Sequence, residues 1–193
     1  MNANYLSSVI KQFQYNRELG WKTITQMPEE SLNWQHNEES NSIVTLVKHL
    51  SANMLSRWTD FLTSDGEKDW RERDSEFEAE ILDLNALKII WDKGWDCLIS
   101  TLKGLNPEDL EKIVYIRNQG HTVVEAINRQ LSHYSYHVGQ IVFIGKMICN
   151  DQWQSLSIPR GQSKDYNKEM FAKEKSRAHF TKDFISEDPE NNS

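Results

Sequence analysis

Apolar residues recur at helical spacing in four long segments of the chain. The clearest stripe is Ile127, Leu131, Tyr134, Val138, Ile141, Gly145 and Ile148, whose members are alternately four and three residues apart. This spacing places them along one face of a helix, and it is typical of helices that pack in a bundle at about 20°. The same periodicity predicts helices over residues 4–27 and 84–103. It also predicts a second helix that begins after Asn41 or Ser42, has apolar residues as far as Phe61, and is stopped by Asp65 and Gly66.

Start and stop signals fix the ends of the predicted helices. Asn41 or Ser42 is expected to cap the second helix, and Pro28 to end the first. Thr122 and Glu125 fit the S/T-x-x-E capping box, in which each side chain accepts a hydrogen bond from the backbone of the other. The fourth helix should therefore begin directly after Thr122.

The segments between and after the helices are less regular. Two short β-type runs around Asn118, within residues 112–123, predict a small hairpin before the fourth helix. Residues 28–41 are polar, and Trp34 is their expected anchor. Near the end of the chain, a polar and lysine-rich segment predicts a further helix over residues 164–182.

Length and composition fit one helical domain. The chain has 193 residues, and its eight glycines and four prolines are too few for a turn-rich sandwich or barrel. We predict an all-α fold with a single domain over residues 1–182. It divides into a bundle core, 4–150, and a C-terminal extension, 151–182, and a disordered tail, 183–193, follows it.

Charge and hydropathy argue against two kinds of partner. The net charge is −7 and the isoelectric point about 5.4, whereas binding to a nucleic-acid backbone needs a basic surface. No apolar run approaches the roughly 18 residues of a membrane span, and the first residues do not resemble a secretory signal. Two cysteines cannot form a disulfide framework. We therefore expect a cytoplasmic protein that binds neither nucleic acid nor membrane.

The negative charge is concentrated in one segment. Residues 60–83 contain ten acidic and three basic side chains. These acids lack the spacing of a calcium-binding loop, so we interpret the segment as a solvated connector between the second and third helices.

Three histidines form the main candidate for a chemical site. His133 and His137 are four residues apart on the fourth predicted helix, so their imidazoles project from one face, one turn apart. Such a pair offers two nitrogen ligands to one metal ion. His49, in the middle of the second helix, would be a third ligand if the two helices are neighbours. Spacing alone also suits histidines at the bundle edge that hydrogen-bond to Tyr134, Tyr136 or the backbone.

Three polar residues lie at helical spacing from these histidines. Gln140 lies three positions after His137 and could hydrogen-bond a metal ligand. Arg129 lies four positions before His133 and could bind an anionic cosubstrate. Asn53 lies four positions after His49. Each also suits an ordinary polar position at a bundle edge. The sequence assigns no catalytic residue.

Two segments carry a resemblance to a known superfamily. VKHLSANMLSRW, residues 47–58, and HYSYHVGQI, residues 133–141, resemble the DinB-like (YfiT-type) superfamily. The resemblance covers about residues 1–150 in element order. Its specific residues are His49, His133, His137, Gly139, Gln140 and Ile141. Residues 70–77 and 158–167 resemble a bacillus-type branch of that superfamily with no assigned function.

The resemblance implies a fold, a metal and a reaction. Members are four-helix bundles in up-down-down-up order, and they often pair as homodimers. One divalent metal is held by the three histidines, with zinc or nickel expected first and iron, cobalt or copper as alternatives. Some members resemble enzymes that use low-molecular-weight thiols such as bacillithiol. This implies a metal-dependent thiol S-transferase that joins such a thiol to a small electrophile.

Two other functions fit the same residues. One is metal-dependent hydrolysis, with water in an open metal position and a carboxylate as general base. Glu125 is a poor base, because it lies two turns before His133 and is rotated by about 80°. The other is a non-enzymatic, stress-related binding protein that carries a metal and uses its charged segments to contact a partner.

Overall fold

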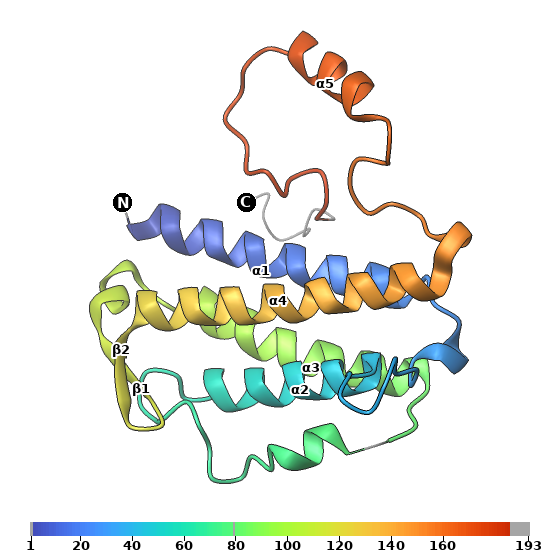
Figure 1. Cartoon of the computed structure of the whole chain (residues 1–193). Coiled ribbons are helices and arrows are strands. Elements are labelled where there is room, and N and C mark those ends of the chain that lie inside the picture. Colours follow the sequence, from blue (N-terminus) through green and yellow to red (C-terminus); the bar gives the residue numbers. More distant parts are fainter. Residues whose placement is uncertain (1, 79, 186–193) are drawn as a thin grey trace.

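The computed structural model describes residues 2–78 and 80–185, and within them the protein is mostly helical (Figure 1). Its long helices are α1 (Asn2–Ile24), α2 (Ile43–Trp58), α3 (Leu84–Lys103) and α4 (Val123–Cys149). Helices α1 and α2 each pack on both α3 and α4, so the four close a ring. Figure 1 shows α1 and α4 running in one direction and α2 and α3 in the other. No helix in the described part is long and apolar enough to cross a membrane.

The predicted caps are present at the starts of α2 and α4. Ser42 Oγ accepts a hydrogen bond from the backbone of Thr45 at 3.1 Å. Thr122 and Glu125 form the predicted capping box, with each side chain bonded to the other residue's backbone N–H. Helix α3 occupies its predicted range. Helix α2 ends at Trp58, well before the predicted stop at Asp65 and Gly66, because the next residue is extended and Asp60 has a positive φ of 49°.

Aromatic side chains fill the space that the four helices enclose. The fully buried ones are Phe13, Trp58, Trp91, Trp95 and Tyr134. Trp58 Nε1 donates a hydrogen bond to the Tyr134 hydroxyl at 3.1 Å, and this hydroxyl donates to Asn53 Oδ1 at 2.9 Å. Because Trp58 and Asn53 belong to α2 and Tyr134 to α4, these bonds fix the spacing of two helices through the core.

A hairpin precedes α4, as the sequence predicts. Strand β1 (Ile113–Ile116) pairs antiparallel with β2 (Gln119–Thr122). The turn consists of Arg117 and Asn118, which both have positive φ, the conformation that suits a two-residue hairpin loop. Their backbone N–H groups each donate to the Asp65 carboxylate at 2.8 Å, so the hairpin is fastened to the connector.

Most acidic side chains of the connector, residues 60–83, are exposed, as the sequence predicts, but Glu76 is buried. The connector contains a short 3-10 helix, η2 (Asp74–Phe77), which packs on α2. Glu76 within η2 is only 4% exposed, and the Arg71 side chain is only 2% exposed. Glu76 departs from the prediction because an ion pair between these two side chains allows both charges to be buried.

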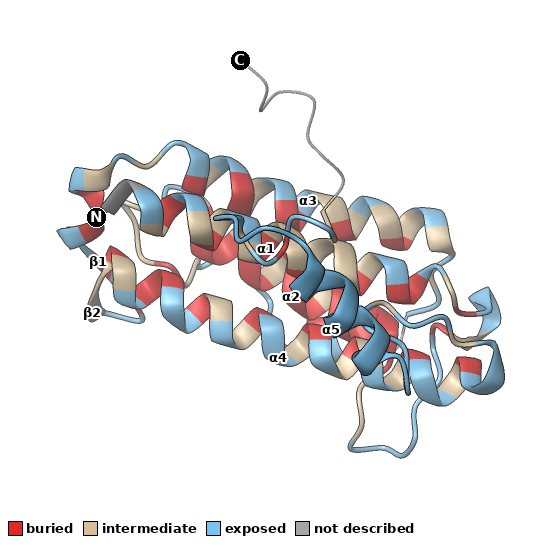
Figure 2. Ribbon diagram, turned by 90° about the horizontal axis from the view of Figure 1, so that it is seen from above, coloured by how far each residue is buried: buried red, intermediate tan, exposed pale blue. Residues whose placement is uncertain are grey.

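The C-terminal extension also differs from the prediction. Helix α5 (Ser163–Ala172) is shorter than the predicted helix over residues 164–182, and every residue in it is exposed (Figure 2). The chain then returns to α1, where His179 Nε2 lies 3.1 Å from the Ser8 hydroxyl. Thr181 in the returning segment is buried. These contacts with α1 replace the expected helical turns. Residues 186–193, most of the predicted tail, lie outside the described part. The domain boundaries remain predictions.

Candidate metal centre

Three histidines meet where α2 faces α4. His49 comes from α2, and His133 and His137 lie one turn apart on α4. The Nε2 atom of His133 lies 3.0 Å from Nε2 of His137 and 3.4 Å from Nε2 of His49. The structure thus brings together the three histidines that the sequence singles out.

The partner of His49 fixes which of its ring nitrogens carries the proton. His49 Nδ1 lies 2.8 Å from Glu76 Oε2. Burial alone would raise the pKa of Glu76, but hydrogen bonds from His49 and Arg71 outweigh burial and lower it. An ionised carboxylate only accepts hydrogen bonds, so Nδ1 of His49 must donate. In the neutral ring, the form that binds a metal, the lone pair is then on Nε2, which faces His133.

His137 is held in the same way from α4. Its Nδ1 lies 2.7 Å from Gln140 Oε1, while Gln140 Nε2 donates to the Tyr136 hydroxyl at 3.2 Å. Since an amide oxygen accepts, Nδ1 donates here too and Nε2 carries the lone pair. For His133, burial and the proximity of His137 and His49 lower the pKa to about 3, so its ring is neutral at pH 7.

These atoms fit a divalent metal ion. Neutral imidazole is the form that binds metals, and the ligand atoms of all three histidines lie within 4.8 Å of one another. Nitrogens about 2.05 Å from zinc would be about 3.3 Å apart at tetrahedral angles and about 2.9 Å apart at right angles. The two separations that involve His133, 3.0 and 3.4 Å, match these values, and the third pair of ligand atoms lies within 4.8 Å. Three protein ligands leave coordination positions for a water or a substrate.

Glu76 is the functional residue that sequence reasoning missed. Arg71 also holds this carboxylate, with Nε 2.8 Å from Oε1 and Nη2 3.0 Å from Oε2, the oxygen that His49 contacts. A carboxylate behind a ligating histidine orients the ring and raises its basicity. The sequence gives no sign of this role, because Glu76 is one of many acids in an irregular connector.

The three histidines line a cavity of about 530 Å³. Asn53 and Arg129, the two remaining polar candidates, also line it, but their hydrogen bonds go to other residues. Asn53 accepts the hydrogen bond from buried Tyr134, so its oxygen serves the core. Arg129 Nη1 lies 3.2 Å from His121 Nε2 near the cavity rim. Of the three candidates, Gln140 is the one that contacts a metal-site histidine.

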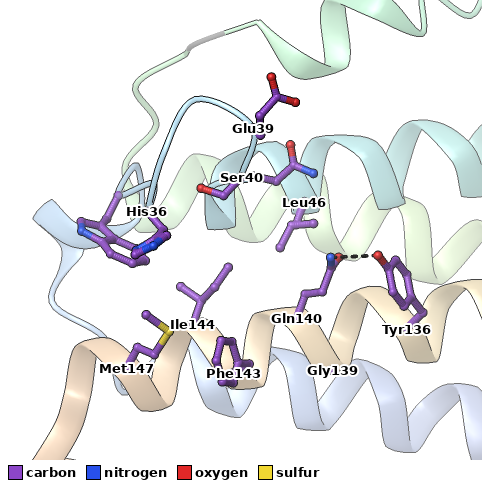
Figure 3. Close-up of a pocket in the computed structure, with 12 residues that line it drawn as sticks. His36, Glu39, Ser40, Leu46, Tyr136, Gly139, Gln140, Phe143, Ile144 and Met147 are labelled. Atoms are coloured by element: carbon purple, nitrogen blue, oxygen red, sulfur yellow. Dashed lines mark hydrogen bonds between the residues drawn. The ribbon is translucent and has the colours of Figure 1, made fainter.

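An apolar cavity of about 650 Å³ lies on the other side of Tyr136, which lines both cavities. Figure 3 shows its apolar wall along α4, formed by Phe143, Ile144 and Met147. Trp34 lines this cavity and is 37% exposed, so it does not anchor its segment as predicted. Leu32 is the fully buried residue of that segment and takes this part.

Comparison with known families assigns the chain to one of them. Residues 1–162 match a family described as "protein of unknown function (DUF1572)", so the chain belongs to this family. The matched range contains all three histidines and ends one residue before α5. A comparison with curated proteins gave no match. Any proposal about function must therefore be argued from the site.

Proposed function

We propose that the protein is a metal-dependent thiol S-transferase of the DinB-like superfamily. A divalent ion, zinc or nickel in the first instance, would be held by His49, His133 and His137. It would activate a low-molecular-weight thiol of the bacillithiol type toward a small electrophile. The observation that carries the proposal is the convergence of three Nε2 atoms, two of them with their Nδ1 partners fixed.

The arrangement of the helices supports the superfamily assignment. Helices α1 and α4 run in the direction opposite to α2 and α3, which is the up-down-down-up order of a DinB-like four-helix bundle (Figure 1). The histidines lie on the second and fourth helices, where the sequence resemblance expects the ligands.

The chemistry assigns a separate task to each group. A divalent metal at such a site lowers the pKa of a coordinating thiol, which then loses its proton near neutral pH. Glu76 and Gln140 hold the histidine rings in the orientation that presents Nε2. In the transfer, a sulfur–carbon bond forms as the bond between the electrophile and its leaving group breaks. The leaving group departs with the electron pair, and the thiol proton passes to solvent.

The carboxylates around the histidines favour a thiol over water as the nucleophile. Hydrolysis needs a general base, but Glu76 is committed to His49 and Arg71. Glu67, which lines the cavity, lies within 4 Å of three arginines. A thiol activated by the metal itself needs no such base.

Metal analysis of the untagged, full-length protein tests the site. We expect about one equivalent of divalent metal in the wild type and in the control His179→Ala, and almost none in His133→Ala. Absence of metal from the wild type after reconstitution would overturn the proposal.

A thiol-dependent assay tests the reaction. With bacillithiol and 1-chloro-2,4-dinitrobenzene, the metal-loaded wild type should consume the electrophile, and His133→Ala should not. Ester hydrolysis without any thiol would favour the hydrolase instead. Bound metal with neither activity would favour the binding protein. Cytoplasmic location and a homodimer also remain predictions. Light scattering tests the dimer, which should have the mass of two 22.6 kDa chains.

A further inference from the structure

The cavity beside the histidines is strongly basic, although the chain as a whole is acidic. Five arginines line it: Arg57, Arg71, Arg73, Arg117 and Arg129. Among the described residues, the carboxylates near these arginines include Glu67 in the lining, Glu76 behind it, and Asp65, whose pKa Arg57 helps to lower. Positive charge therefore exceeds negative charge around an open space next to the metal centre.

Arg57 is the least satisfied of these arginines. Its side chain is only 5% exposed, and its ion pair with Glu67 is long, at 3.8 Å. The Nε and Nη1 atoms have no hydrogen-bond acceptor among the described residues. Buried donors of a charged group are costly to leave unpaired, because they lose their hydrogen bonds to water and gain none in the protein. Nη1 lies on the side of Gly66, and the Arg57 side chain also lines the cavity.

Arg129 adds a positive charge on the face of α4 that carries the metal ligands. It lies one turn before His133, and within the described part of the chain it forms no ion pair with a carboxylate. Burial lowers the pKa of Arg57, and the nearby charges of Arg129 and Arg71 act in the same direction. A bound anion would relieve this repulsion.

We propose that the cavity binds the carboxylate of a small anionic ligand between Arg57 and Arg129, beside the three histidines. Guanidinium groups suit this task because their planar donors match the two oxygens of a carboxylate. This inference rests on the proposed function for the identity of the ligand, which would be the thiol cosubstrate. The substrate class is then a thiol that carries at least one carboxylate, rather than a neutral thiol.

Calorimetric titration with succinate tests the anion site without the reaction. The probe is a dicarboxylate with no thiol, and the protein is the full-length chain after metal removal. Wild type and the control Arg160→Gln should bind succinate. Arg129→Gln and Arg57→Gln should bind it at least tenfold more weakly. Since Arg57 is buried, Arg129→Gln, on an exposed residue, serves as the test if Arg57→Gln does not fold. No binding by the wild type, or unchanged binding by Arg129→Gln, would overturn the inference.

A comparison of two thiols separates this inference from the proposed function. With metal-loaded protein, mercaptosuccinate should give a KM at least tenfold lower than thioglycerol, which is neutral. Arg129→Gln should raise the KM for mercaptosuccinate only. Equal use of both thiols would refute the carboxylate preference and leave the transferase standing. Succinate binding by a protein with no transferase activity would establish the anion site and refute the reaction.

Discussion

His49 Nδ1 lies 2.8 Å from Glu76 Oε2, although 27 positions separate the two residues in the chain. This contact joins the middle of α2 to the only buried residue of η2. It determines the tautomer of His49, and with it the direction of one metal-binding lone pair.

Loss of the Glu76 charge should weaken metal binding. In Glu76→Gln, the His49 ring loses the carboxylate that raises its basicity, so metal affinity should fall about 10–100-fold. Competition with a chromophoric chelator measures this change. The control is Glu72→Gln, which alters an exposed acid of the same connector. Equal affinities in the two variants would show that Glu76 does not support the site.

Metal removal should destabilise the wild type. A ligand that binds only the folded state stabilises it by about 2.7 kcal/mol at 100 times its dissociation constant. The free energy of unfolding in urea should be larger by about this amount with zinc than with a chelator. In His133→Ala the two curves should coincide. A zinc-dependent shift in that variant would place the stabilising ion elsewhere.

Asp65 should make stability pH-dependent in acid. Although burial opposes the change, hydrogen bonds from the backbone of Asn118, Glu67 and Arg117 lower the pKa of Asp65. A carboxyl whose pKa is lowered by folding stabilises the protein above its ordinary value of 3.8. That contribution is lost as the pH falls below 3.8 through the folded pKa.

Urea midpoints of wild type and Asp65→Asn measure the effect. The variant should be less stable at pH 7 and pH 5, and the difference should shrink below pH 3.8. Asp69→Asn, an exposed neighbour, should keep wild-type midpoints. A difference that stays constant from pH 7 to pH 3 would contradict the assignment.

Two glycines of α4 should respond oppositely to alanine. A Cβ at Gly139 would meet nothing within 4 Å, so Gly139→Ala should stabilise the helix by about 0.5–1 kcal/mol. A Cβ at Gly145 would lie 2.4 Å from Thr23 Cγ2, and Gly145→Ala should therefore destabilise the protein. Thermal or urea unfolding of the pair, measured side by side, checks the signs. Stabilisation of both would mean that α1 and α4 are less tightly packed.

Local patterns in the sequence predict the parts of the site that a single helix determines. His133, His137 and Gln140 lie on one face because helical geometry puts them there, whatever the rest of the chain does. Capping at Thr122 and the range of α3 follow for the same reason. His49 required the further condition that α2 and α4 are neighbours, which its resemblance to a known motif supplied.

Contacts between irregular segments could not be predicted. Glu76 looks like any other acid of the connector, and its burial depends on Arg71 and His49 being in place. Nothing in the sequence indicates that the Arg57 guanidinium is buried beside Gly66 and the cavity, because this depends on the fold of the connector. In the extension, contacts with α1 decide where α5 ends, and helical propensity alone predicted too long a helix.

Gln140 bonds to His137 through its oxygen and to Tyr136 through its nitrogen, and Tyr136 is shared by the two cavities. A molecule that enters the apolar cavity and rotates this amide would therefore change the electron density at a metal ligand. Thermodynamic coupling is reciprocal, so an ion on the histidines would alter affinity for that molecule by the same factor. The affinity of the apolar cavity for a ligand would therefore depend on whether the histidines hold an ion.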